Sequence, residues 1–280
     1  MRFFVRHRTL YRYSVPIRLA PHVLRLTPRA LGGFQAWQEF LIEPRPWSRR
    51  DGFDGFGNGL INLEFPDMAT DHLSIESRFE IEVVPPPAPV GLFLSPLPWW
   101  GAYAGAEFAP YLDDSAPEPT VAAFANGLLA DVGGDALGFL HHLNHTLHGR
   151  TDRRVRLEGD ARSPAETLAT ATGACRDLTV LFMACCRGFG IPARFVSGYQ
   201  AQAESVDGQR HLHAWPEVFL PGFGWTGFDP THGLPVADGH VALCAAPTQE
   251  ATMPVEGGFW FDGTVITSTL DYTVEIDTRR

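Results

Sequence analysis

The first 84 residues carry short runs in which apolar and polar side chains alternate, the pattern of strands that bury one face. Residues 73–84 show the alternation most clearly, because serine, glutamate and arginine separate their apolar positions. Weaker runs of the same kind cover residues 2–13, 22–27, 36–43 and 59–65. Asp-Gly and Asn-Gly pairs, which favour turns, separate the later runs. This pattern predicts an N-terminal antiparallel β-sandwich over residues 1–84.

Proline interrupts the pattern over residues 85–119, where it occurs nine times. Because proline continues neither strands nor helices, we predict a linker that lies on the surface of the molecule. Trp99 and Trp100 are expected to anchor this linker, since two adjacent exposed indoles are unusual. Apolar residues at helical spacing then predict short helices over residues 120–130 and 136–148.

Two further helix starts follow. Ser163 and Glu166 have the spacing of a capping box, with proline at the first helical position, and open a short helix that ends near Gly173. After Cys175 the chain is apolar on nearly every side of a helix until Gly188. A helix of that kind is buried at the centre of a domain. Cys175 is therefore expected in the first turn of a central helix.

A cysteine at this position needs help to become a nucleophile. An ordinary thiol has a pKa of about 8.5 and is only a few per cent ionised at neutral pH. Lowering that pKa by roughly 2.5 units requires about 3.4 kcal/mol, whereas a helix dipole supplies about 0.3–2 kcal/mol. The thiol of Cys175 therefore requires a nearby imidazolium, the partner that most strongly lowers the pKa of cysteine nucleophiles.

The imidazole is found in a predicted β-hairpin. Strands over residues 213–220 and 225–229 flank a turn that contains Gly222 and Gly224. His213 and Asp229 share a face only if Trp215 pairs with Asp229, which requires an odd-length loop or a bulge with a positive φ at a glycine. In that register Asp229 can orient the imidazole of His213 and stabilise its charged form. His211, two residues earlier on the same face, is the alternative base, and it would need a shifted register.

These segments resemble the bacterial transglutaminase-like family over roughly residues 163–233. The matching blocks are Gly173-Ala-Cys-Arg-Asp, Gly190-Ile-Pro-Ala-Arg-Phe-Val-Ser-Gly-Tyr199, His213-Ala-Trp-Pro-Glu-Val and Gly224-Trp-Thr-Gly-Phe-Asp-Pro. The resemblance implies a papain-like core in which a central helix packs on an antiparallel sheet. It also implies a Cys175–His213–Asp229 triad, amide or peptide chemistry, and a β-rich N-terminal domain.

We therefore expect an α+β protein with three parts. A β-rich domain covers residues 1–84, a Pro-rich linker covers 85–119, and a transglutaminase-like catalytic domain covers 120–280.

The chain departs from the family in two places. No Trp or Tyr lies between Tyr111 and Cys175, where related enzymes carry an aromatic oxyanion donor. A stretch that begins at His240 replaces the family's Gly-Arg-Asp-Tyr-type segment.

The charge and composition of the chain make some classes of binding partner and cellular location less expected than others. The formal net charge is -10, and all 22 basic residues are arginines. A negative field of this size repels nucleic acid and anionic membranes, so neither is an expected partner. The N-terminus does not read as a signal peptide, and no apolar run is long enough to cross a bilayer. The four cysteines are too few for a disulfide framework, so we expect a cytoplasmic protein with reduced thiols.

The expected function is amide or peptide acyl chemistry through a thioester on Cys175, without a cofactor or metal. Hydrolysis is favoured over transfer, because nothing in the sequence would hold a second, amine-bearing substrate. Trp215 and Glu217 share the face of His213 and are the candidate contacts for a peptide or protein amide substrate. The alternative is a catalytically slow peptide-binding or scaffolding module that keeps the triad. A histidine cluster shares one helix face but lacks a further ligand, so no zinc site is expected (His141, His145, His148).

Overall fold

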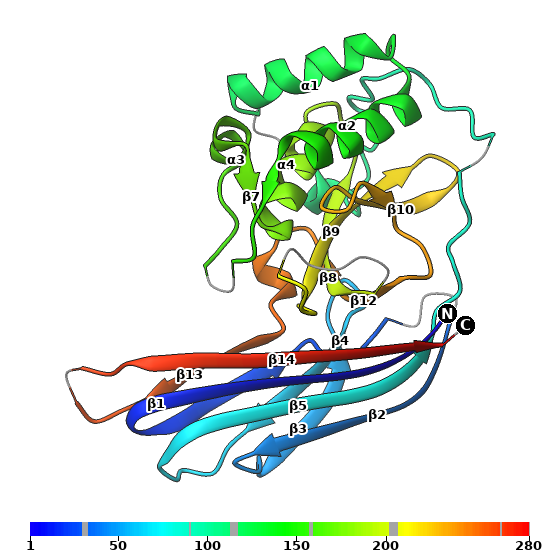
Figure 1. The fold of residues 1–280 in the computed structure, drawn as a ribbon. Coiled ribbons are helices and arrows are strands. Elements are labelled where there is room, and N and C mark those ends of the chain that lie inside the picture. Colours follow the sequence, from blue (N-terminus) through cyan, green and yellow to red (C-terminus); the bar gives the residue numbers. More distant parts are fainter. Residues whose placement is uncertain are drawn as a thin grey trace.

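A computed structural model describes residues 1–29, 33–89, 91–112, 117–156, 159–201, 207–263 and 265–279. An antiparallel sheet built on the N-terminal strands lies beneath a core in which helices cover a second sheet (Figure 1). The fold is mixed α+β, as predicted.

The N-terminal sheet is organised around β1 (Arg2–Leu24), a 23-residue strand. The other strands from this region are β2 (Phe34–Glu43), β3 (Ser48–Phe53), β4 (Gly59–Glu64) and β5 (Thr70–Glu82), in the order β2-β5-β1-β4-β3. The first half of β1 pairs with β5 and its end pairs with β4. The predicted strand 2–13 and the first part of the predicted strand 22–27 thus belong to the single strand β1. Strand β3 was not predicted, because it has few apolar residues. The antiparallel sheet itself is confirmed.

The last two strands return to this sheet. Strands β13 (Val255–Trp260) and β14 (Ser268–Arg279) both pair antiparallel with β1, and Arg2 lies opposite Arg279. The predicted boundary of a catalytic domain at 120–280 is therefore corrected, because strands β13 and β14 belong to the N-terminal sheet. The physical reason is that β5 covers only one edge of β1, so the other edge requires a partner. Both chain ends consequently lie together (Figure 1).

The Pro-rich segment contains no strand and no α-helix among its described residues, 85–89, 91–112 and 117–118. Its regular element is a short 3-10 helix, η1 (Ala109–Tyr111). Trp99 is buried, and its backbone N–H donates to the carbonyl of Phe189 at 2.8 Å. Trp100 is 72% exposed. Its indole N–H nevertheless donates to the carbonyl of Gly188 at 3.0 Å, so both tryptophans anchor the segment as expected.

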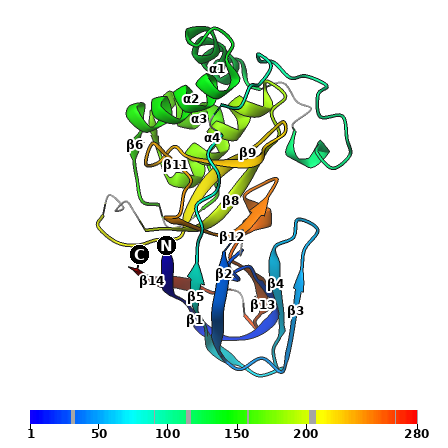
Figure 2. The same cartoon turned by 90° about the vertical axis from the view of Figure 1, so that its right-hand side faces the viewer.

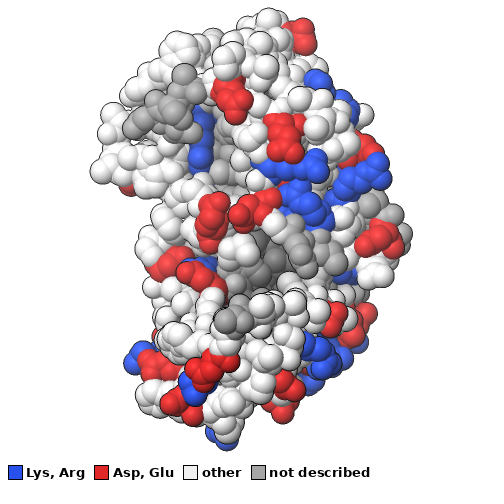
Figure 3. Space-filling view, turned by 90° about the vertical axis from the view of Figure 1, so that its left-hand side faces the viewer, with Lys and Arg blue, Asp and Glu red and all other residues white. Residues whose placement is uncertain are grey.

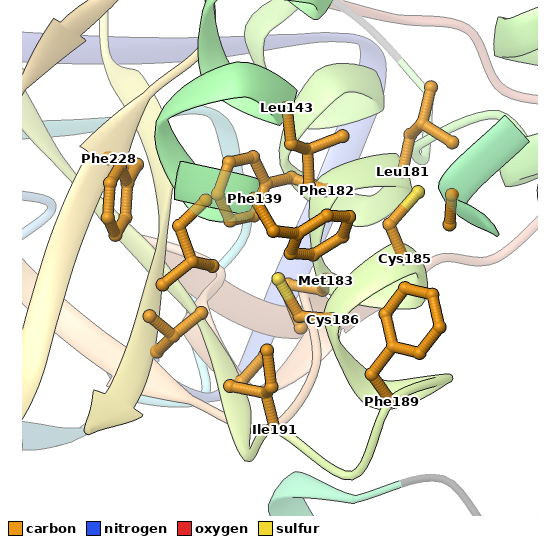
Figure 4. Close-up of a cluster of buried hydrophobic side chains, with 14 of the residues drawn as sticks. Phe139, Leu143, Leu181, Phe182, Met183, Cys185, Cys186, Phe189, Ile191 and Phe228 are labelled. Atoms are coloured by element: carbon orange, nitrogen blue, oxygen red, sulfur yellow. The ribbon is translucent and has the colours of Figure 1, made fainter. Parts of the chain in front are cut away.

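Four helices follow at the predicted places, namely α1 (Pro119–Asp131), α2 (Ala136–Arg150), α3 (Pro164–Thr170) and α4 (Cys175–Arg187). The capping interaction is present, since the Ser163 hydroxyl accepts from the Glu166 N–H at 3.2 Å. Helix α4 is the central one, and Phe182 and Cys186 on it are fully buried. Figure 4 shows these side chains beside Phe139 of α2 and Phe228 of the second sheet.

The second sheet has the order β11-β10-β9-β8-β12. Its members are β8 (Ala193–Gln200), β9 (His213–Leu220), β10 (Gly224–Asp229), β11 (Leu234–Pro235) and β12 (His240–Ala246). Between β9 and β10, Trp225 pairs with Phe219 and Gly227 with Glu217, which leaves a three-residue loop. Continuing this register by two residues brings Asp229 opposite Trp215. Gly222 and Gly224 have φ values of 72° and 99°, so the predicted odd-length hairpin is confirmed.

The N-terminal sheet packs against this second sheet through polar and apolar contacts. Asn58 holds both backbone groups of Ala245, donating to its carbonyl at 3.0 Å and accepting from its N–H at 2.8 Å. His7 on β1 and the Tyr199 hydroxyl on β8 form a buried hydrogen bond of 2.8 Å. Figure 2 shows the two parts in contact below β12. None of the described helices is long and apolar enough to span a bilayer.

Candidate active site

Cys175 is the first residue of α4 and is partly exposed at the floor of a cleft. The start of α4 is fixed by Asp177, whose carboxylate is fully buried. This carboxylate accepts from the Ala174 N–H at 2.8 Å and from both terminal nitrogens of Arg156 at 2.8 and 3.0 Å. A bidentate, charge-assisted pair of this kind sets geometry as well as energy. The position of the thiol is thus determined by the fold around the helix start.

His213 stands at the first position of β9 and lines the same cleft as Cys175, close enough to influence the thiol. Its Nε2 lies 2.9 Å from Oδ2 of Asp229, the last residue of β10. A carboxylate can only accept, so this imidazole nitrogen carries a proton, and Nδ1 is the ring nitrogen left for the sulfur. The structure therefore brings the three predicted residues together in the order thiol, imidazole, carboxylate.

Two more imidazoles converge on the same carboxylate oxygen. His232 Nδ1 lies 2.9 Å and His240 Nε2 lies 3.0 Å from Oδ2 of Asp229. The second oxygen, Oδ1, accepts the backbone N–H groups of Thr231 and His232. Five donors thus surround a carboxylate that has no solvent exposure. This arrangement locks Asp229 in its charged state.

The electrostatics of the site favour an ion pair. Burial acts to raise the pKa of Cys175, but the hydrogen bond and charge of His213 outweigh it and lower that pKa below its ordinary value. Burial acts to lower the pKa of His213, and the charge and hydrogen bond of Asp229 outweigh it, raising the pKa to about 10. Burial acts to raise the pKa of Asp229, which His213 nevertheless holds well below its usual range. These shifts favour a thiolate beside an imidazolium over a neutral pair.

His232 and His240 were not predicted as part of the site. Burial keeps the pKa of His240 below its ordinary value, and its Nδ1 accepts the Ala237 N–H at 3.4 Å, so it is a neutral donor to Asp229. A signal existed for His232, because a turn directly after Asp229 brings the residue three positions on back to the carboxylate. Nothing in the local sequence indicates that β12 delivers His240 to the same place.

His211, the alternative base, lines the same cleft but has other partners. Its Nδ1 faces the Tyr272 hydroxyl at 2.8 Å and its Nε2 faces Asp207 at 2.7 Å. It has no contact with Asp229, so the unshifted register selects His213.

Trp215 and Glu217, the predicted substrate contacts, do not line the cleft at Cys175. Trp215 is buried on the sheet face opposite α4, and the Glu217 carboxylate accepts the Arg194 Nε–H at 2.7 Å. Both line a second cavity, on the side where Arg29 and residues 82–89 lie. The prediction is corrected for a physical reason. Alternate residues of a strand do share a face, but only its first residue, His213, reaches the open end of the sheet.

The cleft contains an aromatic hydroxyl that the sequence did not place there. Tyr272 on β14 lines the cleft, in a part of the chain far downstream of Cys175. Burial and the nearby Cys175 raise its pKa to about 12, so its hydroxyl stays protonated and can donate. The second donor absent from the segment before Cys175 therefore has a candidate from the C-terminal strand.

Among the described residues, the group that could bind a metal overlaps the triad but includes His232 in place of Cys175. Ligand atoms of His213, Asp229 and His232 lie within 4.8 Å of one another. Each imidazole nitrogen already donates to Asp229, so an ion here would replace those hydrogen bonds. The helical histidines do not assemble into a site. His145 Nδ1 donates to the carbonyl of His141 and His148 Nδ1 to that of Thr231.

Comparison with known proteins agrees with this geometry. The Transglutaminase-like superfamily matches residues 136–230, and the Bacterial transglutaminase-like N-terminal region matches residues 3–82. The chain thus contains a transglutaminase-like core and a bacterial transglutaminase-like N-terminal region. The uncharacterized protein Rv2569c of Mycobacterium tuberculosis H37Rv is 27% identical over 98% of this chain and 92% of its own length.

Two other similarities are more limited. The uncharacterized protein YebA of Bacillus subtilis is 32% identical over 75 residues, which are 23% of this chain and 10% of YebA. The crystal structure of "a Putative Cysteine Protease from Cytophaga hutchinsonii" superposes with a TM-score of 0.70 over 100% of this chain and 92% of that chain. At 16% identity this similarity shows the fold alone.

Proposed function

We propose that this transglutaminase-like protein cleaves an amide or peptide bond through a thioester on Cys175, and that the thioester passes to water. The observation that carries the proposal is that Cys175 and His213 line one cleft and that the buried carboxylate of Asp229 binds the imidazole, an arrangement that favours the charged pair. A thiolate held beside an imidazolium is the activated form of a cysteine nucleophile.

The steps follow from the proton positions. The Cys175 sulfur attacks the carbonyl carbon, and His213 Nδ1–H gives its proton to the departing amine as the C–N bond breaks. His213, now neutral, takes a proton from water, which attacks the thioester and releases the acid and the thiolate. Asp229 stays ionised throughout and stabilises the imidazolium. We also propose that the reaction ends in hydrolysis and that the amide belongs to a peptide or protein. A cytoplasmic location, which would keep the thiol reduced, is part of the same proposal.

Intact-mass spectrometry after acid quenching tests the proposal directly. Wild-type protein incubated with a pool of peptides and glutamine amides should carry an adduct with the mass of the acyl part. The adduct should be released by hydroxylamine and be absent from Cys175→Ser. Product acids formed in heavy-oxygen water should gain one heavy oxygen if hydrolysis completes the cycle. Peptides that bind without an adduct or a product would instead favour the peptide-binding module.

The oxyanion of this reaction needs two donors. One is the backbone N–H of Cys175, because the first N–H groups of a helix have no partner within it. We assign the second to the Tyr272 hydroxyl, which is free to donate when the His211 Nδ1 that faces it is protonated and donates to the hydroxyl oxygen. Tyr272→Phe should lower kcat about 10²-fold, the usual effect of losing one such donor. Alkylation of Cys175 by iodoacetamide forms no oxyanion, so its rate should change far less.

Tyr11→Phe is the matched control, since Tyr11 is partly buried on β1 and lies outside the cleft. Its kcat should stay within about twofold of wild type, as for substitutions away from a site. If Tyr272→Phe lowers alkylation and turnover equally, the hydroxyl acts on the thiolate and not on the oxyanion.

A further inference from the structure

A second cavity lies between the N-terminal sheet and the second sheet, apart from the cleft of Cys175. Its volume is about 670 Å³, within the range of about 300–1,000 Å³ that small-molecule sites usually have. Residues 82–89 line one side of it, and Figure 2 shows the chain rising there from the end of β5 past the second sheet. No described residue lines both this cavity and the cleft of Cys175. The cavity is therefore a separate candidate site.

Most of the described side chains that line this cavity are apolar. They include Phe223, Trp225, Phe228, Val236 and the prolines 85–87. A lining of this kind removes the apolar part of a ligand from water, which is the main source of affinity in small-molecule sites. The few polar groups on the lining then decide which ligand is accepted.

Two buried N–H donors on the lining have no acceptor among the described residues. Trp215 is 1% exposed and its Nε1–H makes no hydrogen bond, and the Nε–H of Arg29 is buried in the same condition. The backbone N–H of Arg29 donates to the carbonyl of Ala242 at 2.8 Å, and Ala242 packs against the small apolar cluster that contains Trp215. Both donors thus lie on the same part of the lining. Because an unpaired buried donor is unfavourable, a ligand that supplies acceptor oxygens gains free energy there.

The buried polar groups of this cavity also carry an excess of positive charge. The Nε–H of Arg194 donates to the carboxylate of Glu217 at 2.7 Å, so the charges of these two buried side chains cancel. Arg29 donates instead to the neutral side-chain oxygen of Asn58, and it forms no ion pair with a described carboxylate. Burial and the neighbouring charge of Arg194 lower the pKa of Arg29, although an arginine stays protonated in proteins. The guanidinium of Arg29 therefore lacks a direct counter-ion.

One further acidic side chain lines the cavity among the described residues. Glu82 is 54% exposed and lies 3.9 Å from a guanidinium nitrogen of Arg2. Water and Arg2 both weaken the field of this carboxylate. The charge of Arg29 in the buried part of the cavity thus remains available to an anion.

We infer that this cavity binds a small carboxylic acid that has an apolar chain or ring. The carboxylate accepts from the guanidinium of Arg29 and from the Nε1–H of Trp215, and the apolar part packs against the aromatic and proline side chains of the lining. An inorganic anion lacks the apolar part, and a neutral lipid lacks the charge, so neither fits both halves of the cavity. The inference goes beyond the proposed function, because it concerns a cavity that Cys175 does not line.

Isothermal titration calorimetry with decanoate tests the inference on the intact protein. Decanoate should bind at least about tenfold more tightly than decanol, which has the same chain length without the charge. It should also bind at least about tenfold more tightly than butyrate, which has the charge but a much shorter chain. Cys175→Ser should give the same Kd for decanoate as the wild type. The result is thus independent of the proposed chemistry at Cys175.

Variants locate the bound decanoate. Arg29→Gln should raise its Kd at least about tenfold, and Trp215→Phe, which keeps an aromatic ring but loses the N–H, should raise it about three- to tenfold. The matched controls are Arg25→Gln and Trp99→Phe, because these side chains are 13% and 4% exposed and lie outside the cavity. Each control should leave the Kd within about twofold of wild type.

A third control covers binding at a different group of arginines. Arginines also line the cleft of Cys175, and Figure 3 shows basic side chains gathered across the middle of the face opposite to that in Figure 2. Arg154 lines that cleft and is 68% exposed, so Arg154→Gln should leave the Kd for decanoate unchanged. If Arg154→Gln weakens binding as much as Arg29→Gln does, the ligand lies in the cleft and the inference is overturned.

Two other results would also overturn the inference. One is equal affinity for decanoate and decanol, because the cavity would then not recognise the carboxylate. The other is a folded Arg29→Gln variant whose Kd equals that of the wild type. Urea unfolding shows whether each variant is folded. If Arg29→Gln does not fold, the comparison of decanoate with decanol on the wild type and the Kd of Trp215→Phe decide the question.

Discussion

Asp229→Asn is expected to lower kcat by about 10³–10⁴-fold on any acyl donor that the wild type turns over. The amide nitrogen of asparagine donates, so it cannot accept at the oxygen position where His213, His232 and His240 now converge. A reoriented His213 would point the wrong nitrogen at Cys175. It would also lose the negative charge of Asp229, which stabilises the protonated imidazole. The measurement is steady-state turnover compared with binding of the same donor.

The same substitution should also destabilise the fold. Removing one partner from a buried, hydrogen-bonded ion pair costs about 3–5 kcal/mol, so the free energy of unfolding in urea should fall by that order. The pKa of Asp229 is lowered in the folded state, so its stabilisation is present above its unfolded pKa and is lost as the pH falls through the folded value. Asp229→Asn should therefore flatten the loss of stability in acid. The exposed Asp271→Asn is the control, and equal effects of the two variants would contradict this account.

His213→Ala should slow alkylation of Cys175 by iodoacetamide about 30-fold or more near pH 6. Without the imidazolium, burial is the dominant influence and the pKa of Cys175 returns to or above that of an ordinary thiol. A thiol with a pKa of about 8.5 is roughly 0.3% ionised at that pH. The greater intrinsic reactivity of a more basic thiolate recovers only part of the loss. The measurement is the alkylation rate of Cys175 across the accessible pH range, with peptide mapping.

The matched control is His211→Ala, which removes a neighbouring imidazole that has no contact with Asp229. Its profile should remain within a few tenths of a pH unit of wild type, because the hydrogen bonds of His211 go to Asp207 and Tyr272 and not to Asp229. Identical profiles for wild type and His213→Ala would show that some other group ionises the thiol. In the wild type, the alkylation rate of Cys175 should change again near pH 10, because His213 loses its proton there.

The triad could be predicted from sequence because each member follows from local rules. The apolar pattern after Gly173 defines the central helix, and its first turn determines where Cys175 lies. An odd-length loop between β9 and β10 fixes the faces of His213 and Asp229. These features depend on residues close to one another in the chain. The resemblance to the family supplied their common role.

The rest of the site depends on contacts between distant segments. Tyr272 reaches the cleft because β14 pairs with β1, and a strand pattern does not show which edge it will join. His240 reaches Asp229 because β12 crosses to the far side of β8. The arginines of the cleft come from three separate loops and helix starts. Trp215 failed as a substrate contact because the N-terminal sheet covers its face of the second sheet, which strand periodicity does not reveal.

The central claim is that the Cys175 sulfur is ionised while the His213 ring is protonated. The most direct measurement is the ultraviolet absorbance of the thiolate, recorded as the difference between wild type and Cys175→Ser during a pH titration. The account predicts that this absorbance is already present near pH 6 and disappears only under more acidic conditions. Absorbance that first appears with a midpoint of about 8.5 or above, as for an isolated thiol, would contradict it.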